Sequence, residues 1–173
     1  MPTVIIRPDA ISSDSGFDQT GSNLLSRIND NDTSTFVVNN TGTGTFTATL
    51  GNNDIYSGAT INNVVVSITG NTINVKVPEA DFEVRLLNAA ESVLQSSTLI
   101  FTPTESTQNG AEYSTSLTPT VVNGFILTGT VETAGFILKE VFITVDYTAA
   151  AVTTAFIGMK SGKYKIVSGK IKI

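Results

Sequence analysis

The densest cluster of oxygen-bearing side chains in the sequence is the run Asn29-Asp30-Asn31-Asp32. Asp30 and Asp32 are separated by one residue, and Ser34 follows at the same interval. Calcium-binding loops place their oxygen ligands at this spacing. The run lacks the glycine and the terminal glutamate of an EF-hand loop, and Asx-rich turns form without any ion. A plain turn is therefore the default interpretation, and calcium bound by Asp30 and Asp32 is the alternative.

Four tyrosines could recognise a ligand, because a phenol ring can stack on a sugar. Tyr56 and Tyr113 fall in expected loops and are the candidates for contact with a glycan, whereas Tyr147 and Tyr164 fall in expected strands. The competing interpretation is that these rings cap the ends of a folded domain. The chain has no Trp, which removes the strongest aromatic platform for stacking a sugar.

Composition argues against catalysis. The chain has no Cys and no His, which excludes thiolate chemistry, imidazole ligands and every His-dependent triad. Glycoside hydrolysis needs two carboxylates in a cleft. The candidate pairs are Glu79 with Asp81 and Glu83 with Glu140. No pattern marks either pair as buried, and no recognisable motif places a base beside a Ser or Thr nucleophile. We therefore predict a protein that is not an enzyme.

Short strands separated by turn signals dominate the sequence, and no window has the apolar period of a helix. We expect strands at residues 3–7, 36–39, 45–50, 61–68, 72–77, 82–86, 92–101, 125–130 and 136–147. Gly70-Asn71 predicts a two-residue hairpin. Residues 9–21 and 102–119 are expected loops, and residues 24–28 are either a short strand or one helical turn. The predicted fold class is all-β, an antiparallel jelly-roll β-sandwich.

Charge is distributed unevenly along the chain. Residues 1–147 carry all fifteen Asp and Glu residues against five basic residues, a net charge of −10, whereas residues 148–173 carry five lysines and no acid. The boundary falls at Ala149-Ala150-Ala151, which resembles a hinge or linker. We therefore divide the chain into residues 1–147, the sandwich, and residues 148–173, the basic C-terminal segment.

The basic C-terminal segment alternates lysine with apolar residues, a period that predicts strands with basic outer positions. These strands could close the sandwich at its edge, where lysines suppress aggregation. They could also form an arm that adds a strand to an acidic partner or to the acidic body of a second copy. The candidate docking residues are Lys160, Lys163, Tyr164, Lys165, Lys170 and Lys172.

Neither nucleic acid nor a membrane is an expected partner. Five lysines without an arginine, on an acidic protein, make a weak electrostatic footprint for nucleic acid. No stretch approaches the ~18 apolar residues of a membrane helix. The start of the chain, Thr3–Ile6 followed by Arg7-Pro8, lacks the features of a secretory signal. We expect a protein kept in the cytosol, exported without cleavage, or released by lysis.

Several stretches together resemble a jelly-roll module of tailed bacteriophages and bacterial surface proteins. Residues 3–8 (TVIIRP), Gly16-Phe17 and residues 28–36 (INDNDTSTF) resemble its opening, an L-R-P strand followed by an Asp-rich loop before a Tyr or Phe. Residues 61–68 are similar to its I-x-x-V-x-V-x-V strand, and residues 140–147 to its closing V-x-V-x-Y strand. The resemblance covers about residues 1–147.

The resemblance implies a non-enzymatic virion protein, assembled in the host cytoplasm as a capsid decoration protein or fibre subunit. Residues 148–173 would then anchor it to the major capsid or tail protein or to a second copy, and a homotrimer is expected by analogy. Some members of the family bind sugars through loop aromatics, sometimes with calcium. A carbohydrate-binding module for host-surface glycans is therefore the alternative, with Tyr56, Tyr113 and the Asp30/Asp32 loop as its site. No cofactor other than calcium is expected.

Overall fold

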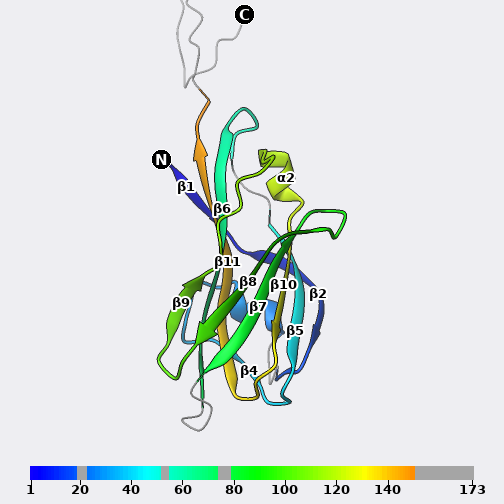
Figure 1. Cartoon of the computed structure of the whole chain (residues 1–173), viewed down its shortest axis with the longest axis vertical. Helices are drawn as coiled ribbons and strands as arrows, with labels where there is room; N and C mark the ends of the chain where they lie inside the picture. The colour runs from blue at the N-terminus through cyan, green and yellow to red at the C-terminus, as the bar shows by residue number, and fades with distance from the viewer. Residues whose placement is uncertain (19–22, 52–54, 74–78, 151–173) are drawn as a thin grey trace, which may run out of the picture.

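The computed structural model describes residues 1–18, 23–51, 55–73 and 79–150 and shows two antiparallel sheets packed face to face (Figure 1). Sheet A contains β1 (Thr3–Ile6), β3 (Phe17–Asp18), β4 (Val37–Asn39), β6 (Thr60–Thr72), β9 (Ser106–Asn109) and β11 (Phe136–Thr148). Sheet B contains β2 (Pro8–Ser15), β5 (Gly44–Leu50), β7 (Ala80–Leu87), β8 (Val93–Phe101) and β10 (Ile126–Val131). The predicted all-β sandwich is confirmed.

The chain winds between the sheets as in a jelly roll. Sheet A has the order β3-β4-β11-β6-β9, and sheet B has the order β2-β5-β10-β7-β8. When the two orders are read side by side, the strands at the same position are consecutive in the chain, such as β4 with β5 and β10 with β11. β1 joins sheet A along the C-terminal half of β11, with Thr3 opposite Asp146. The start of the chain therefore lies beside the end of β11.

Strict alternation of side chains builds the core between the sheets. In β5 the burial pattern alternates at every residue from Gly44 to Leu50, because successive side chains of a strand point to opposite faces. At the centre lie four buried phenylalanines, three from sheet B (Phe46, Phe82 and Phe101) and Phe136 from sheet A. The ring centroids of Phe82 and Phe101 lie 5.3 Å and 5.1 Å from that of Phe136, within the range of favourable aromatic pairs.

Two strand glycines make room for this phenylalanine cluster. A methyl group on Gly129 of β10 would lie 2.4 Å from the Phe46 ring and 2.8 Å from the Phe82 ring. A methyl group on Gly70 of β6 would lie 2.8 Å from the Phe136 ring. Each ring thus occupies the space that a side chain at the neighbouring position would fill. These two positions therefore require glycine, because the side chain of any other residue would clash with a ring.

Gly70-Asn71 is therefore not the predicted hairpin. β6 runs through both residues to Thr72, and Gly70 pairs with Leu138 on one side and with Ser106 on the other. The sequence signal was misleading because glycine serves here for close packing against Phe136 rather than for a turn. The strand expected over residues 72–77 falls largely on residues 74–78, outside the described residues.

Both long loops expected from the sequence contain regular structure. Residues 9–21 contribute most of β2, an edge strand that pairs with β5 through two register shifts. Its polar side chains are tolerated because an edge strand is exposed to solvent. β3 follows it. Residues 102–119 contribute β9, which pairs with β6. Residues 24–28 form the helix α1 (Leu24–Ile28), capped by the Asn23 side chain.

A second helix, α2 (Pro119–Asn123), follows the Thr118 cap, which accepts a hydrogen bond from the backbone N–H of Val121. Each helix contains five residues. Within the described ranges, no helix has the length and apolar character needed to cross a membrane.

A β-bulge in β11 changes which residues face the core. Phe136 and Leu138 are buried, and so are Val141, Ile143 and Val145. The register against β6 shifts between Leu138 and Glu140. The extra residue shifts the alternation of side chains by one position. The buried residues before the bulge and those after it therefore both point towards the core. The strand expected over residues 136–147 is confirmed, and Glu140 on its opposite face is only 7% exposed.

Gly129→Ala tests the packing of the phenylalanine cluster. We expect the free energy of unfolding to fall by about 1–3 kcal/mol, because the new methyl group forces the Phe46 and Phe82 rings to move. The measurement is urea unfolding at neutral pH. Gly51→Ala is the control, since its methyl group would meet the nearest atom at 3.5 Å, an ordinary contact. Equal effects of the two substitutions would refute this account of the core.

Candidate binding surfaces

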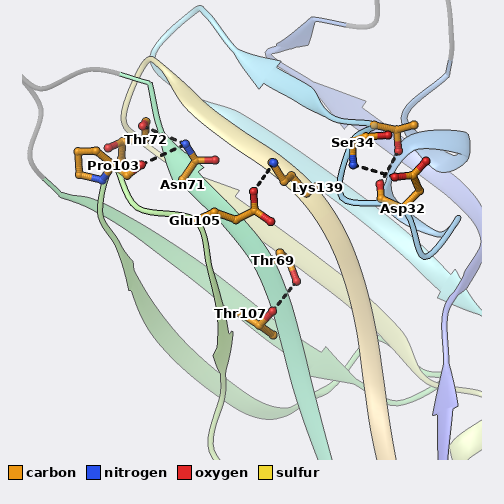
Figure 2. Close-up of polar contacts among 10 residues, drawn as sticks. Asp32, Ser34, Thr69, Asn71, Thr72, Pro103, Glu105, Thr107 and Lys139 are labelled. Carbon is orange, nitrogen blue, oxygen red and sulfur yellow. Dashed lines mark hydrogen bonds and ion pairs between the residues drawn. The ribbon is translucent and has the colours of Figure 1, made fainter.

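The Asp30/Asp32 loop, residues 29–35, is a turn held together by its own side chains. Asp30 Oδ1 accepts a hydrogen bond from the backbone N–H of Asp32 at 3.0 Å, and Asp32 Oδ1 accepts one from the backbone N–H of Ser34 at 2.9 Å (Figure 2). Asp30 Oδ2 accepts a third from the Thr35 hydroxyl at 2.6 Å. The one-apart spacing of the acids is thus explained by two consecutive Asx turns.

The same loop is fastened to the outer face of sheet A. Asn31 takes a left-handed conformation with φ of 59°, and its Oδ1 accepts a hydrogen bond from Arg7 Nη2 at 2.5 Å. The Arg7 guanidinium lies over the Phe142 ring, 5.6 Å from its centroid, an attractive cation–π geometry. No local pattern in the sequence marks Arg7 as a contact of this loop, because Arg7 and Asn31 are 24 residues apart. The arrangement accounts for the polar run structurally, and no group of three or more acidic side chains suited to a metal occurs in the part of the chain described.

The two candidate glycan residues have different environments. Tyr56 is 71% exposed in a turn closed by a 2.8 Å hydrogen bond from Ala59 N–H to its carbonyl. Its ring lies against Gly58, where a methyl group would come within 2.8 Å of Cε1. Tyr113 is partly buried against the core, and its backbone pairs with Val64 of β6. The Tyr56 ring is therefore exposed to a ligand, whereas the Tyr113 ring packs partly against the core.

Sheet B has an acidic outer surface near the start of β7. Asp81 and Glu83 line a shallow hollow of about 620 Å³. The remaining lining residues are Glu79, Glu132, Thr98, Thr130 and Thr133. Register explains the grouping, since Glu83 stands between Thr98 of β8 and Thr130 of β10. The candidate pair Glu79 and Asp81 thus shares one surface, whereas the candidate pair of Glu83 with Glu140 is wrong, because Glu140 belongs to the other sheet.

One ion pair modifies this acidic hollow. Arg85 Nε lies 2.8 Å from Glu83 Oε1, with both side chains well exposed. The hydrogen bond from Arg85 is the main cause of the lowered pKa of Glu83, and the same bond raises the pKa of Arg85. Among the described residues, Glu79, Asp81 and Glu132 form no ion pair. The hollow therefore keeps an excess of negative charge.

The outer face of sheet A carries a row of polar contacts that fastens the connection after β8. The Thr69 and Thr107 hydroxyls lie 2.8 Å apart, and the Ser67 hydroxyl donates to Asn109 Oδ1 at 2.8 Å. Lys139 forms an ion pair with Glu105 (Figure 2). The hydroxyl contacts hold β9 against β6, and the ion pair joins the residue before β9 to β11, so these polar residues serve the fold.

The predicted docking residues Lys160, Lys163, Tyr164, Lys165, Lys170 and Lys172 lie outside the described residues. The described chain ends at Ala150, whose Cβ lies 3.4 Å from the position of a methyl group on Gly58. The basic C-terminal segment therefore begins at the end of the sandwich that carries Tyr56.

Asp32→Ala tests the turn through its pH dependence. The Ser34 hydroxyl, followed by the Ser34 backbone N–H, lowers the pKa of Asp32. A folded-state pKa below the unfolded value of about 3.9 stabilises the fold fully above that pH. This contribution is lost as the pH falls through the folded-state pKa. Urea unfolding should show wild type more stable than Asp32→Ala at pH 6, with the difference shrinking towards pH 2. Asp32→Asn, which keeps a neutral acceptor, is the control, and a pH-independent difference would contradict the assignment.

Comparison with known proteins identifies no family. No family model matches the chain, and no curated protein matches it. Two glycosidase structures are similar at 13% identity: an arabinose-bound α-L-arabinofuranosidase (TM-score 0.44, 81% of this chain and 24% of that one) and an Arthrobacter globiformis isomalto-dextranase with panose (0.42, 83% and 23%). A xylan-binding domain from Paenibacillus barcinonensis is also similar at 13% identity (0.35, 59% and 72%). The chain spans about a quarter of each glycosidase, and these similarities concern the sandwich fold alone.

Proposed function

We propose that the chain is a non-enzymatic structural subunit of a bacteriophage virion, a capsid decoration or fibre subunit. Residues 1–147 form its exposed sandwich, and the basic C-terminal segment anchors it. The observation that supports the proposal is that residues 1–148 already supply two packed sheets. Among the described residues, the last buried apolar side chain of the core is Val145 and the last strand ends at Thr148. Five lysines then follow without an acid, which suits attachment to an acidic surface.

The partner of the basic C-terminal segment is the major capsid protein, the tail protein or a second copy of this chain. Repetition of one modest contact by the symmetry of a virion gives firm attachment through avidity, because each further contact forms at high effective concentration. Assembly takes place in the host cytoplasm, and the protein leaves the cell in the particle. A homotrimer is the oligomer suggested by analogy with other decoration and fibre proteins.

Truncation after Ala149 tests the anchor. We expect the shortened chain to remain folded, because it keeps every residue that is buried in the described part of the chain, and to be absent from purified particles. A full-length variant with all five lysines of the segment changed to alanine should also be lost from particles, and the variant with five arginines should be retained. Truncated protein that occupies particles at the wild-type level would overturn the proposal.

A second candidate function, recognition of host-surface glycans, rests on the exposure of Tyr56. Its ring is exposed at the end of the sandwich and lies against Gly58. An exposed ring in a fixed position suits stacking on a sugar. On a glycan array, Tyr56→Ala should abolish any signal, and Tyr56→Phe should retain it, because the stacking face is unchanged. Arrays with calcium and with a chelator test whether Asp30 and Asp32 contribute an ion. No signal from the wild-type protein under either condition would remove this candidate.

A further inference from the structure

β8 is the sheet edge best suited to accept another strand. It contains nine residues, whereas β9 contains four and β3 two. The opposite edge of sheet B, β2, begins with Pro8 and has two register shifts, features that blunt an edge. In the described parts of the chain, no hydrogen bond between two backbone groups involves residues 93–101 outside the pairing with β7, although the Ser96 carbonyl accepts a hydrogen bond from the Gln95 side-chain amide at 3.3 Å. β8 therefore presents a long row of backbone groups that a further strand could pair with.

The outer face of β8 combines an exposed apolar side chain with neighbouring acids. Ile100 is 53% exposed and stands opposite Asp81 of β7, and Thr98 stands opposite Glu83. A strand added to β8 would lie about 5 Å from it and about 10 Å from β7. The side chain of a lysine on the outer face of such a strand covers only part of this second interval, so it would bend over β8 to bring its ammonium group towards the acids of β7. The surface therefore favours a strand that places lysines outward.

The basic C-terminal segment has this pattern. Lys163 and Lys165 alternate with Tyr164 and Ile166, and the final residues 170–173 read Lys-Ile-Lys-Ile. Because successive side chains point to opposite faces, Lys163 and Lys165 of one strand would lie over the acidic hollow while Tyr164 and Ile166 continue the inner face. On that inner face, β8 contributes Leu99 and Phe101 to the core. Lys170 lies five residues beyond Lys165 and would face the opposite side if the same strand continued.

Distance favours a strand from a second copy over the chain's own segment. Glu132 and Thr133 of the hollow precede the start of β11, whereas Ala150 follows its end (Figure 1). A strand of 13 residues spans about 43 Å. Residues 151–162 reach at most about 43 Å when fully extended. The chain's own segment would have to run straight back along the whole sandwich before its first paired lysine.

We propose that residues 163–167 of one copy add a strand to β8 of a second copy, with Lys163 and Lys165 placed over Asp81 and Glu83. This inference rests on the proposed role of the basic C-terminal segment and names a second copy as its partner. The exchange contributes backbone hydrogen bonds from β8 and charge complementarity from the acidic hollow. It also covers Ile100.

Light scattering of the full-length protein tests the exchange. Wild type should have a mass that is a defined multiple of 18.2 kDa. The double variant Asp81→Lys/Ile100→Lys should run as a single chain, because two cations then face the incoming lysines. Changing Lys163 and Lys165 to Glu should also give a single chain. Asp146→Lys in sheet A is the matched control and should retain the wild-type mass.

Combining the two sets of changes in one chain makes the test decisive. The two cations introduced beside β8 then face the two carboxylates introduced in the segment, so the multiple mass should return. Failure of this rescue, or a wild-type protein that is monomeric at 100 μM, would overturn the inference. Particle incorporation separates it from the proposed function. If Asp81→Lys/Ile100→Lys still enters particles while the truncation does not, the segment anchors the protein to another virion component, and the exchange is wrong.

Discussion

The packing of four phenylalanine rings against two glycines is the constraint on which the sandwich depends. Phe136 belongs to sheet A and its ring neighbours Phe82 and Phe101 belong to sheet B, so the cluster fixes how the sheets face each other. Gly129 and Gly70 leave the space that the rings fill. Interiors at crystal-like density tolerate little added volume. The relative position of the sheets therefore depends on the absence of two side chains as much as on the presence of four rings.

The period-two pattern predicted most strands because it records burial directly. The strands around Phe82 and Val141 followed the expected alternation, since one face of each meets the core. Gly70 was wrongly assigned to a turn, because the sequence alone does not distinguish a glycine required for close packing from a glycine required for a turn. β2 was missed because an edge strand can carry polar residues on both faces. These errors share one cause: the partner strand, which decides each case, is distant in sequence.

The candidate surfaces were predicted unevenly for similar reasons. Asp30 and Asp32 stood out by their spacing. The Asx turns that explain this spacing involve only neighbouring residues, so the turn could be predicted from the sequence. The separation of Tyr56 from Tyr113 depends on how loops pack, which no local pattern encodes. The acidic hollow joins residues from β7, β8 and β10. Only the strand order brings Glu132 next to Asp81 and Glu83, although the excess of acids in residues 1–147 was visible from the sequence.

The placement of the chain ends has a mechanical consequence. β1 runs antiparallel to β11 with Thr3 opposite Asp146, so opposing forces on the two termini would open that pairing one hydrogen bond at a time, as a zipper. A load between the far end of the sandwich and the end of β11 acts differently. β11 is paired along nearly its whole length with β6, and sliding it out would strain many bonds at once. A subunit held by its C-terminus would thus resist drag on its body far better than tension on its N-terminus.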